Sequence, residues 1–195
     1  RNHYTFAGDQ MSEYVILTDS NGKILKTVAS YPSMKFNAWI KHKARFTVFF
    51  PELILCPWIT DTALYGYPSE YRLFVADSRG KIISIIEKEE SPAKITSKER
   101  DKVIDEIMDQ LESKNPQRKE SRQELEKRTF FPDNWPFFEA ILSDEEGRIF
   151  LQRLKSNLSQ ETGFDFDFFS PDGIYLYRMI VHETVLLIKE EFIYN

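Results

Sequence analysis

The chain has 195 residues, enough for its folded form to bury about 70% of the surface that the unfolded chain exposes, so a real core is expected. Aromatic residues make up 14% of the composition, with 16 Phe and 9 Tyr, and such residues favour strands. The net charge is −5 with both signs spread along the chain, which excludes the basic patch that nucleic acid or an anionic membrane surface requires.

No run approaches the roughly 18 consecutive apolar residues of a membrane span, so none is predicted. The segment Arg1-Asn2-His3-Tyr4 also lacks the apolar core of a signal peptide.

Glycine turns between strand-like segments are the most informative pattern. The motif Asp-Ser-x-Gly-Lys-Ile begins at Asp19 and again at Asp77, 58 positions later, and each copy predicts a β-hairpin. Because both copies join equivalent strands, we predict that Gly22 and Gly80 occupy equivalent turns with positive φ. Asp19, Asn21 and Asp77 resemble metal-loop ligands, but Asp and Asn side chains in turns bond nearby backbone groups, and we assign them to the turns.

A second recurrence is Phe-Phe-Pro followed by an acidic residue, at Phe49 and at Phe130. A Trp/Pro pair follows soon after each copy, and each copy is predicted to lead into a new unit of strands.

These landmarks divide the chain into units of four strands. The predicted strands are 4–8, 14–18 and 24–29 in the first unit, 53–60, 63–67, 71–76 and 82–87 in the second, 138–143, 149–154, 164–169 and 174–181 in the third, and 184–188 and 192–194 in a fourth. Repeated units of this size, each a four-stranded antiparallel sheet, predict an all-β fold built of β-propeller blades.

A helical and charged insertion is predicted at about residues 91–128. Thr96 and Glu99 have the spacing of a capping box, and one-face apolar spacing follows, so a helix is expected at about 97–113. We predict that its apolar residues face the propeller and that 117–128, with only Leu125 as a large apolar residue, is an exposed helix or mobile loop. Those helical residues are Val103, Ile107 and Leu111. The insertion is either a solvated face or a cap or docking element.

No catalytic, metal or cofactor site is predicted from motifs. Cys56 lies in an apolar run, which favours a buried, inert thiol. His3, His42 and His182 have no partner at metal-ligand spacing.

Alternation puts Asp165 and Asp167 on one face of a strand with phenylalanines on the other. We interpret the two carboxylates as a solvent-facing acidic stripe, with a calcium or general-acid role as the alternative.

Aromatic side chains offer the best candidates for binding. Trp58, Trp135, Tyr65 and Tyr67, together with Trp39, could line a sugar- or peptide-binding face, because flat amphipathic rings supply contact area with little loss of entropy. The alternative is that they pack between blades.

Three segments resemble the bacterial six-bladed, NHL- and TolB-like β-propellers: Asp77-Ser78-Arg79-Gly80-Lys81-Ile82, Asp144-Glu145-Glu146-Gly147-Arg148-Ile149-Phe150 and Phe168-Phe169-Ser170-Pro171-Asp172-Gly173-Ile174-Tyr175. The resemblance implies that residues 1–195 form a partial propeller, because six blades need about twice this length. The remaining blades would come from a longer chain or a second copy, and these residues alone should not form a well-behaved monomer.

The resemblance also implies a periplasmic or cell-surface location, because many relatives are exported or lipid-anchored. The function expected from it is a non-enzymatic scaffold that binds a protein or a small ligand such as a carbohydrate. The alternative is a propeller enzyme, a hydrolase or lyase, whose site residues come from several blades at the central channel.

Overall fold

The computed structural model describes residues 2–7, 10–35, 37–38, 46–114, 121–156, 158–159, 162–182, 187–189 and 192–194. Strands dominate this part of the chain, and they pair almost entirely in antiparallel sheets. The all-β prediction is therefore confirmed.

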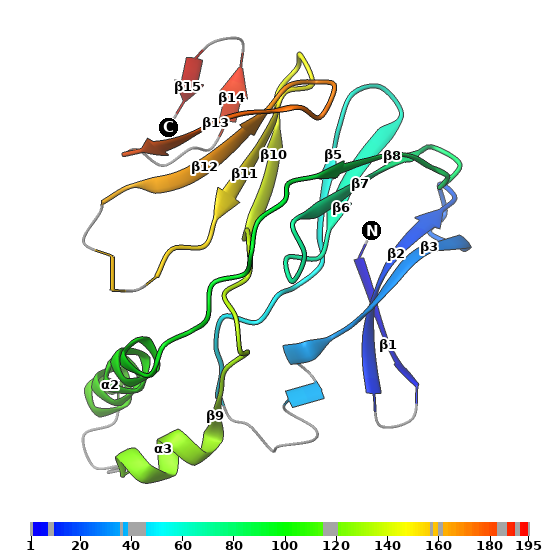
Figure 1. Ribbon diagram of the computed structural model, residues 1–195. Coiled ribbons are helices and arrows are strands. Elements are labelled where there is room, and N and C mark those ends of the chain that lie inside the picture. The colour runs from blue at the N-terminus through cyan, green and yellow to red at the C-terminus, as the bar shows by residue number, and fades with distance from the viewer. Residues whose placement is uncertain are drawn as a thin grey trace.

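Three sheets follow one another along the chain, and in each the strands are adjacent in the order of the sequence (Figure 1). The first contains β1 (Asn2–Ala7), β2 (Gln10–Thr18) and β3 (Ile24–Pro32). The second contains β5 (Ile54–Pro57), β6 (Thr62–Gly66), β7 (Arg72–Asp77) and β8 (Ile82–Glu87). The third contains β10 (Ala140–Ser143), β11 (Ile149–Arg153), β12 (Phe164–Phe169) and β13 (Tyr175–Val181). A hairpin of β14 (Leu187–Lys189) and β15 (Phe192–Tyr194) follows.

The repeated turns have the predicted geometry. Gly22 has φ 84° and Gly80 has φ 67°, which confirms the prediction of positive φ at both positions. In each turn the glycine N–H donates to the carbonyl of the aspartate three residues earlier. The side chains of Asp19 and Asp77 accept from backbone N–H groups two and four residues later, which is why this position carries an aspartate.

The same irregularity accompanies these two turns and the turn between β12 and β13, where Gly173 has φ 79°. The register shifts by one residue between Leu17 and Thr18, between Val75 and Ala76, and between Phe168 and Phe169. A β-bulge therefore recurs at one place in all three hairpins, and the first hairpin has a further shift between Val15 and Ile16.

The sheets pack face to face through contacts that also repeat. One apolar cluster joins the first sheet to the second, and another joins the second to the third. A Cβ added to Gly80 would lie 2.8 Å from Val28 of the preceding sheet, and one added to Gly173 would lie 2.6 Å from Ile86 of its preceding sheet. Val28 and Ile86 are 58 positions apart, the same interval as the two turn motifs.

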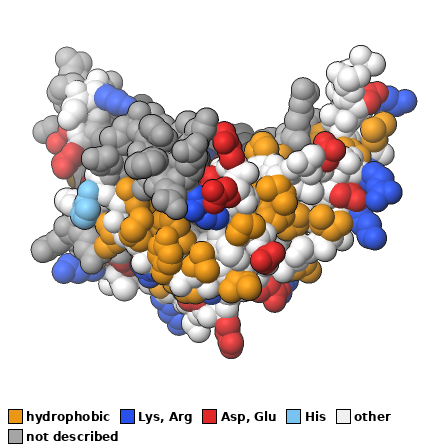
Figure 2. All heavy atoms as spheres, turned by 90° about the horizontal axis from the view of Figure 1, so that it is seen from above, with side chains coloured by type: hydrophobic (Ala, Val, Ile, Leu, Met, Phe, Trp, Pro, Cys, Tyr) orange, Lys and Arg blue, Asp and Glu red, His pale blue; other side chains and the backbone are white. Residues whose placement is uncertain are grey.

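The outer strands carry much exposed apolar surface. Figure 2 shows hydrophobic side chains gathered in patches, interrupted by charged ones, on the face seen from above. The exposed large apolar residues of the outer strands are Ile24 and Leu25 on β3, Ile83 and Ile85 on β8, and Tyr175, Leu176, Tyr177 and Met179 on β13.

The segments that lead into the second and third sheets run side by side. Strand β4 (Phe46–Thr47) pairs in parallel with β9 (Thr129–Phe130), and Val48 N–H donates to Phe130 O at 3.1 Å. The ring centroids of Phe49 and Phe131 are 6.3 Å apart. Each Phe-Phe-Pro copy therefore leads into a sheet, as predicted.

Helix α2 (Ser97–Lys114) and helix α3 (Arg122–Arg128) lie together beyond one end of the sheets (Figure 1). Val103 and Ile104 of α2 and Leu125 of α3 are buried. Among the described residues, the apolar clusters of the sheets contain no residue of α2, whereas α2 contacts α3, so the prediction that Val103, Ile107 and Leu111 face the sheets needs correction.

The segment predicted to be exposed includes α3, whose residues are mostly exposed apart from Leu125. Residues 117–120 of that segment lie outside the described residues. Among the described residues, neither α2 nor α3 is long and apolar enough to cross a membrane.

Candidate functional site

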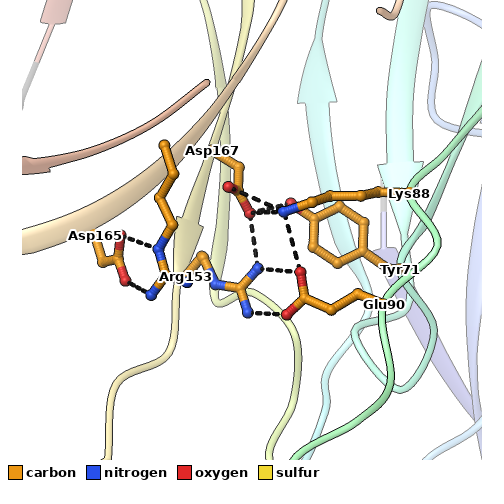
Figure 3. Close-up of polar contacts among 7 residues, drawn as sticks. Tyr71, Lys88, Glu90, Arg153, Asp165 and Asp167 are labelled. Atoms are coloured by element: carbon orange, nitrogen blue, oxygen red, sulfur yellow. Dashed lines mark hydrogen bonds and ion pairs between the residues drawn. The ribbon is translucent and has the colours of Figure 1, made fainter. Parts of the chain in front are cut away.

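A cluster of charged residues joins the second sheet to the third, and we call this place the junction (Figure 3). Its members are Tyr71 at the start of β7, Lys88 and Glu90 just after β8, Arg153 at the end of β11 and Asp167 on β12. The fully buried carboxylate of Asp167 accepts from the Tyr71 hydroxyl at 2.5 Å and from Arg153 Nη1 at 2.8 Å. Lys88 Nζ lies 3.2 Å from Asp167 and 3.0 Å from Glu90.

The two acids of the junction are held in their charged forms. Burial alone would raise the pKa of Asp167, but the hydrogen bonds from Tyr71 and Arg153 and the nearby Lys88 outweigh it and lower that pKa. The pKa of Glu90 is likewise lowered, since bonds from Arg153 and Lys88 outweigh burial. Burial, reinforced by Asp167, raises the pKa of the Tyr71 hydroxyl, which stays neutral and donates.

With two cations and two anions, the junction balances its own charge, and its bonds cross from one sheet to the other. The junction therefore positions neighbouring parts of the chain. It fixes the end of β11 and the residues that follow, and these residues form the walls of two cavities.

Asp165 and Asp167 are not a solvent-facing stripe, and that interpretation is wrong. Their exposed fractions are 1% and 0%. Alternation does place them on one face, but this face of the third sheet lies against the second sheet, while Phe166 and Phe168 pack on the opposite face. Arg178 on β13 pairs with Asp165, with its Nε 2.8 Å from Oδ1.

The smaller cavity, of about 210 Å³, lies between the junction and the start of α2. Glu99 is buried here and accepts from Thr96 N–H at 2.8 Å and from the Ser156 hydroxyl. Thr96 and Glu99 form the predicted capping box, and Glu99 also ties the helix to the segment after β11. Burial opposes the charge of Glu99, but the bonds from Ser156 and Thr96 lower its pKa.

The larger of the two cavities near the end of β11, of about 520 Å³, is lined by residues of β5 and of the segments that lead into β5 and β10, while a third hollow, of about 660 Å³, lies over Glu70, Lys88 and Glu89. Pro136 and Leu154 line both cavities. Its apolar walls come from β5 and from the segments that lead into β5 and β10, and they include Phe49, Phe50, Leu53, Ile54, Leu55 and Phe138.

The charged side chains in the described lining of the larger cavity are Lys35, Glu52 and Glu139. Lys35 Nζ and Glu52 Oε1 are 2.6 Å apart, so these two groups neutralise each other. Glu139 accepts from the neutral amide of Gln152 at 2.6 Å. Burial raises the pKa of the Glu139 carboxyl, although the bond from Gln152 opposes that shift.

The four aromatic residues predicted as ligand-binding lie in different places. Trp135 is buried, lines the smaller cavity and lies 4.2 Å, centroid to centroid, from Phe49. Trp58 donates from Nε1 to Gly147 O at 2.8 Å and so joins the turns of neighbouring sheets.

Tyr65 and Tyr67 are buried between the first and second sheets. Tyr65 stacks on Phe74, and burial raises its pKa to about 12. Tyr67 stacks on Tyr31 and lines a separate cavity of about 230 Å³. A ligand-binding role for these residues stays a prediction, and Trp39 lies outside the described residues.

The remaining candidate groups are the cysteine and the histidines. Cys56 is half-buried, and burial raises the pKa of its thiol, which keeps it protonated. His182 is exposed, whereas His42 and the side chain of His3 lie outside the described residues. Within the described part of the chain, no group of three or more His, Cys, Asp or Glu side chains is placed to hold a metal ion.

Sequence reasoning missed Lys88, Glu90, Arg153 and Glu139. The available signal was the position of Arg153 at the end of a predicted strand next to the one carrying Asp167, because paired strands bring such residues to one face. Searches against protein-family models and against curated proteins give no match for this chain.

Proposed function

We propose that the chain contributes successive blades to a β-propeller of the six-bladed, NHL- or TolB-like kind, and that it acts as a scaffold that binds a small ligand or protein. The repetition of its sheet contacts supports the propeller. The same glycine turn, the same bulge and the same glycine-to-aliphatic contact recur from sheet to sheet. Identical contacts between successive units are how repeat proteins bury their faces.

The single observation that carries the binding role is the larger cavity beside β5. Its volume of about 520 Å³ falls within the range of about 300–1,000 Å³ that is typical of small-molecule sites. Small-molecule sites combine apolar side chains with a few polar groups, and the lining of the larger cavity contains both. In a propeller the innermost strands surround the central channel, so a ligand here would be reached from that channel.

The alternative function is a propeller enzyme, a hydrolase or lyase, with residues gathered from several blades. The junction does gather ionisable residues from two sheets, but its ion pairs join those sheets, which favours a structural role for them. A bacterial protein of the periplasm or cell surface remains part of the proposal.

Methyl NMR with a fragment library tests the binding role, because methyl spectra tolerate assemblies several times the mass of one chain. We expect bound fragments to shift the methyl signals of Ile54, Leu55 and Leu154, which line the larger cavity. The exposed Ile24 and Ile174 serve as controls. Shifts confined to the control residues, or no shifts at any fragment charge, would overturn the proposal.

A further inference from the structure

We propose that the larger cavity binds a small organic cation, an ammonium or guanidinium group carried on an apolar body, with Glu139 as its counter-ion. This inference deepens the proposed binding function and rests on it. It specifies the chemical class of the ligand and the residue that selects it.

The charge of the cavity is the first argument. Lys35 and Glu52 neutralise each other at 2.6 Å, which leaves the charge of Glu139 uncompensated in the described lining. The neighbour that Glu139 has is the amide of Gln152, a neutral donor. Glu139 is exposed as a whole residue, and a carboxylate that lines a cavity and accepts from a neutral donor is stabilised when a cation comes within hydrogen-bonding reach.

The state of Glu139 agrees with this argument. Burial raises the pKa of its carboxyl group and so disfavours the carboxylate form. At the junction, Asp167 is fully buried and Glu90 is partly buried, yet their pKa values are lowered because Arg153 and Lys88 face them. Among the described residues, the acids of the junction are bonded to cations, whereas Glu139 is bonded to the neutral amide of Gln152.

The walls of the cavity supply the second argument. Phe49, Phe50 and Phe138 line it together with aliphatic residues of β5. Aromatic faces attract cations, and the apolar walls favour burial of a hydrocarbon body. A metal ion or an inorganic cation would leave these walls unused, whereas an amine with an apolar body uses both the carboxylate and the walls.

The test compares three probes of similar shape: phenethylamine, which is a cation, 2-phenylethanol, which is neutral, and phenylacetate, which is an anion. Each is titrated into the full 195-residue chain while the methyl signals of Ile54, Leu55 and Leu154 are followed. We expect the amine to bind most tightly and the anion most weakly. Glu139→Gln should weaken binding of the amine by about tenfold and leave binding of the alcohol unchanged within about twofold.

Glu89→Gln is the matched control, because Glu89 is an exposed carboxylate that does not line the larger cavity. Glu89→Gln should change neither the affinity for phenethylamine nor the affinity for 2-phenylethanol. Equal binding of the amine and the alcohol, or an unchanged affinity for the amine in Glu139→Gln, would overturn the inference. Binding of the alcohol alone would also overturn the inference but would leave the general binding role intact. No methyl shift with any of the three probes would count against the inference and against the binding role.

A second measurement needs no variant. The carboxyl carbon signal of Glu139 reports its titration in the unchanged chain. Phenethylamine should lower the pKa of Glu139 towards or below its ordinary value, and 2-phenylethanol should not. A Glu139 pKa that is the same with both probes would contradict the inference, even if Glu139→Gln does not fold.

Discussion

The residue that ties the second and third sheets together is Asp167. Its carboxylate has an exposed fraction of 0% and receives bonds from Tyr71, Arg153 and Lys88. Removing one member of a buried ion pair costs more than the pair contributes, because the partner charge is left buried without compensation.

We therefore expect Asp167→Asn to lower the free energy of unfolding by about 3 kcal/mol, since it leaves Arg153 and Lys88 with one anion between them. Urea denaturation followed by circular dichroism measures this loss. Asp165→Asn is the control on the same strand face. Its partner Arg178 has a side chain that is 52% exposed and can return to water, so the loss should be smaller. Equal losses would contradict the role assigned to Asp167.

The junction also predicts a direction for the pH dependence of stability. The pKa values of Asp167 and Glu90 are lower in the folded chain than in the unfolded chain, where they are about 4. Their contribution is therefore complete above about pH 5 and is lost as the pH falls through the folded pKa values.

Denaturation midpoints measured from pH 7 down to pH 3 should fall below about pH 5. In Asp167→Asn the fall should be shallower, because one of the two linked protons no longer binds. A steeper or identical pH profile in the variant would exclude Asp167 as a source of the dependence.

The turn glycines test the contact between sheets. Gly80 combines φ 67° with a position against Val28, whereas Gly22 has φ 84° but is exposed. Gly22→Ala should cost about 1 kcal/mol from backbone strain alone. Gly80→Ala should cost about 1–3 kcal/mol more from overpacking, and Val28→Ala should relieve part of that excess. Thermal denaturation measures both losses of stability. Equal losses in Gly22→Ala and Gly80→Ala would contradict a contribution from the contact between Gly80 and Val28.

Residue patterns predicted the turns but not the junction. Gly22 and Gly80 were predictable because positive φ is a local demand of the hairpin. The burial of Asp165 and Asp167 was not, because alternation shows which residues share a face and not what covers that face. Lys88 is 79 positions from its partner Asp167, and no local pattern joins them.

At the scale of elements, both helices begin with a capping box. Thr96 and Glu99 cap α2, and Ser121 and Glu124 cap α3, each through reciprocal side-chain and backbone bonds. The first box was predicted from its spacing, and the second has the same spacing, so the choice between helix and loop for the later segment could have been made. Glu99 also accepts from Ser156, which fastens α2 to the third sheet.

Thr96→Ala should destabilise the start of α2 by about 1 kcal/mol, because the first-turn N–H of Glu99 loses its acceptor. Hydrogen exchange of residues 97–101 should accelerate, while exchange in β11 and β12 should not change. Ser121→Ala is the matched control and should affect α3 instead. Acceleration throughout the third sheet after Thr96→Ala would show that the helix is not a separate element of stability.

Element packing was harder to predict than element type. The periodicity of α2 was clear, and the helix ends one residue beyond the predicted 113. Its apolar face was predicted to meet the sheets, but α3 packs beside it, and Arg122 of α3 pairs with Asp101 and Asp105 of α2. The parallel pairing of β4 and β9 was also not predictable, because it joins two segments that are far apart in the sequence and neither segment alone indicates its partner.

At the scale of the molecule, neighbouring sheets cover each other's faces, and on the far face of the third sheet Phe166 and Phe168 are buried while apolar residues of β13 are exposed. Tyr177 stacks on Phe168 on that face and is 51% exposed, and Met179, also on that face, is 39% exposed. Apolar surface of this kind is normally covered by another layer. If the sheets are equivalent and stacked, the exposed apolar part of this face is predicted to pack against a further sheet.

Light scattering coupled to size-exclusion chromatography of the 195-residue chain tests this claim most directly. The account predicts species heavier than 23.1 kDa whose mass rises with concentration, and a shift towards the single-chain mass in the double variant Tyr177→Lys and Met179→Lys. A single species of 23.1 kDa at every concentration, with a sharp cooperative melt, would contradict the account.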